Sequence, residues 1–531
     1  MKNKFIYLAI LAAGFASCEP EFENDVDANY TSGNADFTSY VAVGNSLTAG
    51  YMDGTVYKTG QMNSYPNMLA QQFALVGGGS FTQPYYGDDA NNLGGLTLGG
   101  VQIASTRLVI DASEGRPENI TGTPTIEVSD IHAGPYNNMG VPGAKSFHLV
   151  ANGYGNVAGV AIGAANPYFV RMASSSSTSV LADAMAMDPT FFTNWIGSND
   201  VLAYATNGGA QDDGMTPAED HNETGNMDPS TYGGNDITNA MVFGNVYSTI
   251  VNTLTSGGAK GVVATIPSVT SIPYFTTVPY APLSPAALGG QSNIDLLNAN
   301  LYGPLDAVFT AYGEPNRINP LSSVAVNPIL IYDADAADRT AQISGALQMQ
   351  GYPASIADEI GMAYGKARQA NTADLVVLPA SSVIGTVNSG ASATLASLGL
   401  NINGVSYPMA NRWVLTANEK AKVAAATDAF NATIVSIANT NDLAVADMNT
   451  MMNLLVNGLR IETGQIFTAD YFSGIETENE VLFSLDGVHP NAKGYAVITN
   501  SIINLINQYY NANLPLKYVN DYPGIHIVGS N

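Results

Sequence analysis

The sequence predicts an α/β fold in which a mostly parallel sheet is covered by helices on both faces. Two observations predict it. Short apolar runs, typical of buried strands, alternate along the chain with longer segments in which apolar residues recur every three or four positions. The polar residues that stand out as candidates for chemistry follow these runs, and parallel sheets place their ligands beyond the carboxyl ends of the strands.

The individual elements follow from local patterns. Runs rich in β-branched and aromatic residues predict strands at 38–43, 190–196, 261–266 and 443–446. Helical spacing predicts helices at about 64–75, 236–254, 416–438 and 491–510. The third of these begins with a capping box, in which Thr416 and Glu419 are three residues apart. The last has apolar residues at helical intervals and predicts one buried face: Tyr495, Ile498, Ile502, Leu505 and Tyr509.

The composition restricts the classes of function. The chain has 531 residues, of which 46% are hydrophobic and only 12% charged, so it is long and apolar enough for a sizeable core. Its 18 Lys and Arg against 44 Asp and Glu give a net charge of −26, which excludes a binder of duplex nucleic acid. A single cysteine excludes a disulfide framework and every metal site that needs several cysteines.

The N-terminus is similar to a bacterial lipoprotein signal. Two lysines precede an uncharged apolar run at 5–15, and small residues come directly before Cys18. The similarity implies a signal peptide at 1–17 and lipidation of Cys18; the alternatives are an ordinary secretory signal or a chance cysteine. The acidic linker at 18–36 is similar to the surface-export signal of Bacteroidetes lipoproteins. We therefore expect an exported protein, lipid-anchored to the bacterial outer membrane, and the membrane face that it occupies stays open.

A serine follows the first predicted strand directly. Ser46 stands in the segment Gly44-Asn45-Ser46-Leu47, at a turn from strand to helix. Such a turn exposes the hydroxyl beside free backbone N–H groups, as a nucleophile requires. Serines also open many helices simply as caps, so this segment by itself leaves both interpretations open.

An acid and a histidine stand three residues apart near the other end of the chain. In one turn, Asp486 and His489 can meet directly, and the carboxylate can then hold the imidazole in the tautomer that a general base needs. The alternative is a capping Asp with an incidental His. The remaining histidines lie in Gly-, Asn- or Pro-rich surroundings without metal-ligand spacing, and we interpret them as surface or loop residues: His132, His148, His221 and His526. For His148, a place in the wall of the cleft is the alternative.

Acyl transfer also needs donors for the developing oxyanion. Asn199 follows the predicted strand 190–196, so its side-chain amide is one candidate. Gly143 closes the segment 138–143, and its backbone N–H is another, because glycine allows a ligand to approach closely. Each segment alone is also an ordinary turn.

In this order, the four segments resemble the GDSL/SGNH hydrolase family of serine esterases and lipases. The resemblance implies that Ser46 is the nucleophile, that His489 is general base and then general acid, and that Asp486 orients His489. It implies an oxyanion hole made by the backbone N–H groups of Ser46 and Gly143 and the side chain of Asn199. It also implies a three-layer α/β/α sandwich of the flavodoxin-like kind, with a mostly parallel five-stranded sheet, and no metal or organic cofactor.

The sequence departs from the family pattern in two respects. Asn45 stands where the family usually has an aspartate before the nucleophile, which leaves the triad complete. The chain is also much longer than small family members. We expect one hydrolase domain at 37–515 and a C-terminal tail at 516–531, with long loop insertions at about 77–134, 201–235 and 270–414.

The substrate stays open at this point. We expect a carboxylic ester, either of a lipid, with an apolar entry, or of a glycan, with an open polar cleft. A carbohydrate O-acetyl esterase and a surface lipoprotein that binds without turnover are the alternatives. The acidic cluster at 333–338 lacks the glycine and distal glutamate of a calcium loop and is interpreted as a solvated turn.

Overall fold

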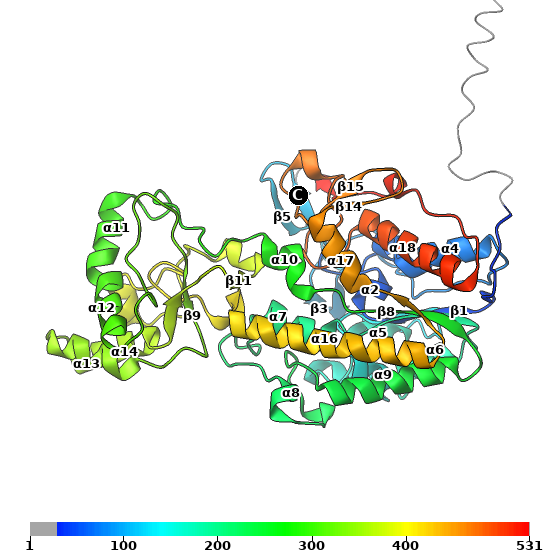
Figure 1. Ribbon diagram of the computed structural model, residues 1–531, viewed down its shortest axis with the longest axis horizontal. Helices are drawn as coiled ribbons and strands as arrows, with labels where there is room; N and C mark the ends of the chain where they lie inside the picture. Colours follow the sequence, from blue (N-terminus) through cyan, green and yellow to red (C-terminus); the bar gives the residue numbers. More distant parts are fainter. Residues whose placement is uncertain (1–28, 530–531) are drawn as a thin grey trace, which may run out of the picture.

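The computed structural model describes residues 29–529 and shows a body built on one central sheet, with a lobe beside it (Figure 1). The predicted signal peptide and the lipidation site Cys18 lie outside the described residues. None of the helices in the described part of the chain is both long and apolar enough to cross a membrane.

The central sheet has five strands, all parallel, which confirms the predicted α/β class. Their order across the sheet is β13-β8-β7-β1-β6. Four were expected from apolar runs: β1 (Tyr40–Gly44), β7 (Phe191–Trp195), β8 (Lys260–Ala264) and β13 (Ala444–Ala446). The fifth, β6 (Asn138–Gly140), has only three residues and lies in the segment that was interpreted as an oxyanion loop. Strands buried on both faces read as continuous apolar runs, as β1 does here.

Helices cover both faces of this sheet (Figure 1). On one face lie α4 (Tyr65–Ala74), α17 (Met448–Asn457) and α18 (Ala492–Tyr510), and on the other lie α6 (Val180–Met185), α9 (Ala240–Thr255) and α16 (Ala417–Thr440). Aromatic rings join α4 to the sheet and join two helices of the other layer to each other. Phe73 of α4 packs edge-on against Tyr40 of β1 at 4.9 Å, and Phe430 of α16 stacks on Phe243 of α9 at 4.3 Å.

Two helices show where local periodicity and capping signals predict the structure and where they do not. The capping box of α16 is present, with the N–H and hydroxyl of Thr416 both bound to the carboxylate of Glu419. For α18 the prediction is confirmed only in part: Tyr495, Ile498 and Ile502 are buried, but burial is not confined to one face. Its first nine residues are all buried, because this half is enclosed by α4 and by the segments around 481–483 and 517. At the other end, Tyr509 is 42% exposed while Tyr510 is buried.

The residues between the sheet elements form structures of their own. Residues 278–411 form the lobe, which holds α11 (Gln291–Leu297), α12 (Gly303–Ala311), α13 (Thr340–Met349), α14 (Ala354–Tyr364) and β9 (Leu330–Tyr332) (Figure 1). The segment expected to be irregular at 77–134 contains four short strands: β2 (Leu96–Leu98), β3 (Val101–Ala104), β4 (Leu108–Asp111) and β5 (Arg116–Asn119). The C-terminal strand β16 (Ile527–Val528) pairs with β4, so the tail is tied to this segment.

Candidate active site

The candidate residues gather at the carboxyl edge of the sheet. Strands β6, β1 and β7 end side by side, with Gly140 opposite Gly44 and Gly44 opposite Trp195. Glycine is required at Gly44, because a Cβ there would lie 2.5 Å from the carbonyl oxygen of Trp195. The loops that follow these strands therefore deliver Gly143, Ser46 and Asn199 to one edge.

Ser46 begins a short helix, α2 (Ser46–Ala49), directly after β1. The helix is capped by Asn45, whose side-chain oxygen accepts a hydrogen bond from the N–H of Leu47 at 3.1 Å. At the other end, Gly50 adopts the left-handed conformation with φ +77°, which closes the turn. As the first residue of the helix, Ser46 has a backbone N–H without an intrahelical acceptor, so this donor is free for a ligand.

A continuous hydrogen-bond relay links Ser46 to the acid and histidine of the C-terminal segment. The Ser46 Oγ lies 2.8 Å from Nε2 of His489, and Nδ1 of the same ring lies 2.9 Å from Oδ2 of Asp486. These are the distances at which a base can take a proton from a hydroxyl while a carboxylate orients it. The structure thus brings together the three residues predicted to act as nucleophile, base and orienting acid, although Ser46 and His489 are 443 residues apart.

The Asp486 carboxylate is held in its charged form by a ring of donors. One oxygen accepts hydrogen bonds from the N–H groups of Val488 and His489 and from the hydroxyl of Ser484, and the other accepts from the N–H of Gly54. Burial opposes ionisation, but the imidazole and these donors outweigh it and lower the pKa of Asp486. A carboxylate fixed in this way keeps the imidazole in one orientation and stabilises its protonated form.

A second buried carboxyl group, that of Asp53, lies next to this loop. Its oxygens accept hydrogen bonds from the N–H of Leu485 at 3.1 Å and from the hydroxyl of Tyr57 at 2.7 Å, and its own N–H donates to Ser484 Oγ. Burial raises the pKa of Asp53 to about 6, helped by the negative charge of Asp486 and opposed by the two hydrogen bonds and Arg107. This residue was not predicted from the sequence, because nothing in its local pattern relates it to a loop more than 430 positions away.

Residues on the lobe side of the site pack against the loop that carries Asp486 and His489. Gly487 has φ +70°, and a Cβ added there would lie 2.8 Å from a methyl group of Leu378 and 3.1 Å from the backbone nitrogen of Tyr274. The N–H of Tyr274 also donates to the carbonyl oxygen of Gly487 at 2.9 Å. On the opposite side, the ring of Tyr51 lies 4.5 Å from that of His489. The loop that carries the acid and the histidine is therefore fixed from both sides.

The structure places the two further oxyanion candidates differently. Asn199 lines the same pocket as Ser46 and His489, with one amide N–H donated to the carbonyl oxygen of Ala144 at 2.9 Å. Gly143 follows β6 in an exposed turn with φ +76°, and it is not part of the pocket wall. Asn45 was not predicted to be a donor, yet it lines the pocket, and its buried Nδ2 has no hydrogen-bond partner among residues 29–529.

An apolar pocket opens beside the relay. It holds about 840 Å³ of space not filled by atoms, including open solvent at its mouth. Its polar wall residues come from the strand ends and from the loop of His489, and its apolar wall comes mainly from α17 and the segments around 267–272 and 482–498. Helix α17 was not predicted from the sequence, although Met448, Met451, Met452 and Leu455 have helical spacing and lie on one side of it.

One of the other histidines was interpreted wrongly from the sequence. His221 was expected to be a surface or loop residue, but it is buried, with Nε2 3.0 Å from Asp236 Oδ2 and Nδ1 3.0 Å from Thr224 Oγ1. Asp236 is further bound by Gln211 and by the N–H groups of Glu219 and Gly233. Every polar atom of this pair has a protein partner, so the pair is a structural link between the 201–235 segment and α9.

Comparison with known proteins identifies no relative: no family model, no curated protein and no solved structure matches the chain.

Proposed function

We propose that the protein is a serine hydrolase of carboxylic esters. The observation that carries the proposal is the relay from Ser46 Oγ through His489 to Asp486, with distances of 2.8 and 2.9 Å. A serine hydroxyl is a weak nucleophile until a base within hydrogen-bond reach takes its proton, and the base needs an orienting group on its other nitrogen. These three residues meet both requirements at the carboxyl edge of a parallel sheet, where such folds act on their ligands.

The proposed reaction has two halves. Ser46 Oγ attacks the ester carbonyl carbon while its proton passes to Nε2 of His489, and the negative oxygen that forms accepts hydrogen bonds from the Ser46 N–H and Asn199. The bond to the alcohol oxygen then breaks, and His489 gives its proton to that oxygen, which leaves an acyl group on Ser46. Water attacks this acyl-enzyme, its proton passes through His489 to Ser46 Oγ, and the carboxylic acid leaves.

We also propose that the chain is a member of the GDSL/SGNH hydrolase family. The order of the four motifs along the chain and the all-parallel sheet support an SGNH-type three-layer sandwich, in which Gly143 would supply the third oxyanion donor. The lipidated Cys18, the outer-membrane anchor and the surface location likewise remain proposals supported by the N-terminal sequence.

The decisive experiment compares wild type with Ser46→Ala on nitrophenyl esters and on a fluorophosphonate probe. If the relay acts as a unit, Ser46→Ala lowers kcat by a factor on the order of 10⁶ and abolishes covalent labelling. Ser436→Ala, on the exposed side of α16, is the matched control and should leave both unchanged. A Ser46→Ala variant that hydrolyses esters at the wild-type rate would refute the mechanism.

The same two assays distinguish an ester hydrolase from a protein that binds a ligand without turnover. A surface protein that binds a ligand without turnover needs no activated serine, so it would neither hydrolyse these esters nor react with the probe. Labelling at Ser46 without turnover of any nitrophenyl ester would instead keep the activated serine and show that these esters are the wrong substrates.

A further inference from the structure

Building on the proposed ester hydrolysis, we infer that the pocket beside Ser46 binds the acyl chain of the substrate and that α17 sets the chain length it accepts. The inference chooses between the two substrate types that the sequence left open. It assigns an ester with an apolar acyl chain in place of an acetyl group on a sugar. It also states which part of the ester occupies the pocket, the acyl portion and not the alcohol portion, although either could be apolar.

The chemistry of the wall carries the first part. Among the described residues, no Asp, Glu, Lys or Arg lines the pocket, so no charged side chain there compensates the desolvation of a charged ligand. The polar members of the wall, Asn45, Ser46, Ser198, Asn199 and His489, are those delivered by the strand ends and the catalytic loop. The pocket is therefore polar where the ester group has to lie and apolar beyond it.

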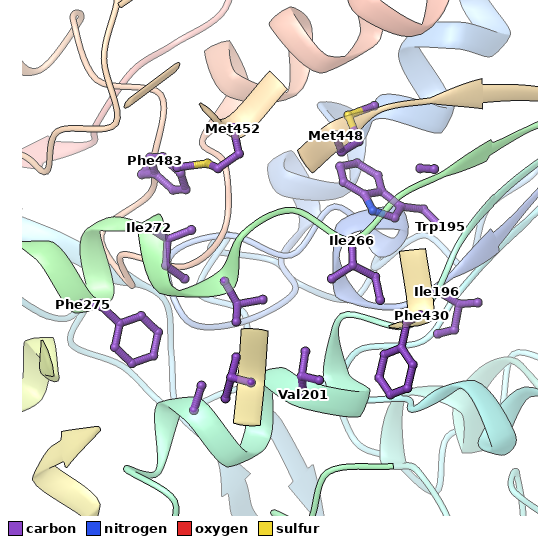
Figure 2. Packing of buried hydrophobic residues seen from close by; sticks show 14 of the residues in the cluster. Trp195, Ile196, Val201, Ile266, Ile272, Phe275, Phe430, Met448, Met452 and Phe483 are labelled. Atoms are coloured by element: carbon purple, nitrogen blue, oxygen red, sulfur yellow. The ribbon is translucent and has the colours of Figure 1, made fainter. Parts of the chain in front are cut away.

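The apolar part of the wall has an identifiable shape. Figure 2 shows Met448 of α17 packed by the indole of Trp195 and Met452 packed by Phe483, with Ile272 across from Met452. All five residues are buried and all belong to the wall. Methionine side chains are unbranched and flexible, so they can adapt their shape to an alkyl chain. Rigid apolar side chains cannot adapt in this way.

The course of the reaction assigns the acyl side. During turnover the acyl group stays bonded to Ser46 Oγ, whereas the alcohol leaves and water has to take its place next to His489. The position of the alcohol must therefore communicate with solvent in every cycle. An apolar recess that water enters reluctantly suits the group that remains attached. The acyl chain is the occupant that this requirement selects.

The test measures kcat/KM for nitrophenyl acetate, butyrate, hexanoate and octanoate below their aggregation limits. Each methylene buried in the pocket should raise kcat/KM about fourfold, so hexanoate should exceed acetate by a factor on the order of 10². A parallel series of alkyl acetates varies the alcohol alone and should give a flat profile. A rise with the alcohol chain but not with the acyl chain would overturn the assignment.

Two substitutions at one wall position should move the profile in opposite directions. Met452→Trp fills the recess and should reduce the ratio of hexanoate to acetate to below about tenfold, whereas Met452→Ala lengthens the recess and should shift the optimum to longer chains. Leu454→Trp, exposed on the same helix and outside this pocket, should keep the wild-type profile. An unchanged profile in both Met452 variants would overturn the role of α17, and Met452→Ala decides the matter if the larger residue prevents folding.

Failure of this inference is distinguishable from failure of the proposed function. A flat acyl profile with turnover that depends on Ser46 refutes the acyl pocket and leaves an ester hydrolase. Absence of Ser46-dependent turnover and of fluorophosphonate labelling refutes the hydrolase itself.

Discussion

The buried carboxyl group of Asp53 predicts an unusual pH dependence of stability. Its pKa in the folded protein is about 6, against about 4 for an unperturbed aspartate in the unfolded chain. The groups that face it are Asp486, whose charge disfavours its ionisation, and Arg107 and Tyr57, which favour it. A difference of about two units corresponds to about 3 kcal/mol between the protonation states.

The sign follows from where the proton is bound. Below about pH 4 both the folded and the unfolded chain hold it, and above about pH 6 neither does. Between these values the folded protein keeps the proton and the unfolded chain releases it, so the free energy of unfolding falls as pH rises. Asp53→Asn has no proton to release. Relative to this variant, wild type should lose about 2 kcal/mol of stability from pH 4 to pH 7, with most of the loss before pH 6.

The measurement needs a signal from the body of the protein. The chain has two tryptophans, Trp195 in the sheet and Trp413 beside the lobe, so a Trp413→Phe background makes Trp195 the single reporter. Urea unfolding at pH 4, 5, 6 and 7 then gives the difference in stability between this background protein and its Asp53→Asn variant at each pH. Asp428→Asn, on the exposed surface of α16, is the control and should show no such trend. A difference that is independent of pH, or one that grows in favour of the protein with Asp53 as pH rises, would refute the reasoning.

Two further substitutions test how the site is held. Gly487→Ala combines a left-handed φ of +70° with a contact of 2.8 Å to Leu378, whereas Gly385→Ala at φ +79° meets open space. Both should cost about 1–2 kcal/mol of stability, as urea unfolding would show, but only Gly487→Ala should displace the catalytic loop and lower kcat on the order of 10²-fold. Asn199→Ala should lower kcat by about 10²–10³ with little change in KM, because it removes one donor to the oxyanion. A raised KM with an unchanged kcat would contradict this role.

The sheet was predictable because its signals are local. The runs that became β1, β7, β8 and β13 consist mostly of apolar residues, and this pattern can be recognised without knowledge of any neighbour. Strand β6 was not recognised, since three residues with an asparagine and a glycine carry no strand pattern. Its glycine, Gly140, instead allows close approach to the backbone of α2, where a Cβ would lie 2.3 Å from the nitrogen of Ala49. The outer position Tyr509 was assigned to the buried face because periodicity cannot show which end of a helix is enclosed.

The residues of the candidate site also fall into a group that local sequence predicted and a group that it did not. Ser46, Asp486 and His489 were predicted because their short segments, each ambiguous by itself, stand in a recognisable order along the chain. The residues that pack around these three were not predicted, since Asp53, Tyr51 and Leu378 come from separate parts of the fold and have ordinary local sequences. Their contribution depends on long-range packing, to which a reading of local pattern has no access.

The separation of Ser46 from His489 along the chain has a consequence for how the protein is made. His489 lies 443 residues after Ser46, and at about 5–20 residues per second a ribosome takes roughly 20–90 s to add that stretch. Throughout this time the serine exists without the imidazole that would activate it. The relay can therefore close only after His489 has been made, and a chain cut short anywhere before this residue lacks the imidazole.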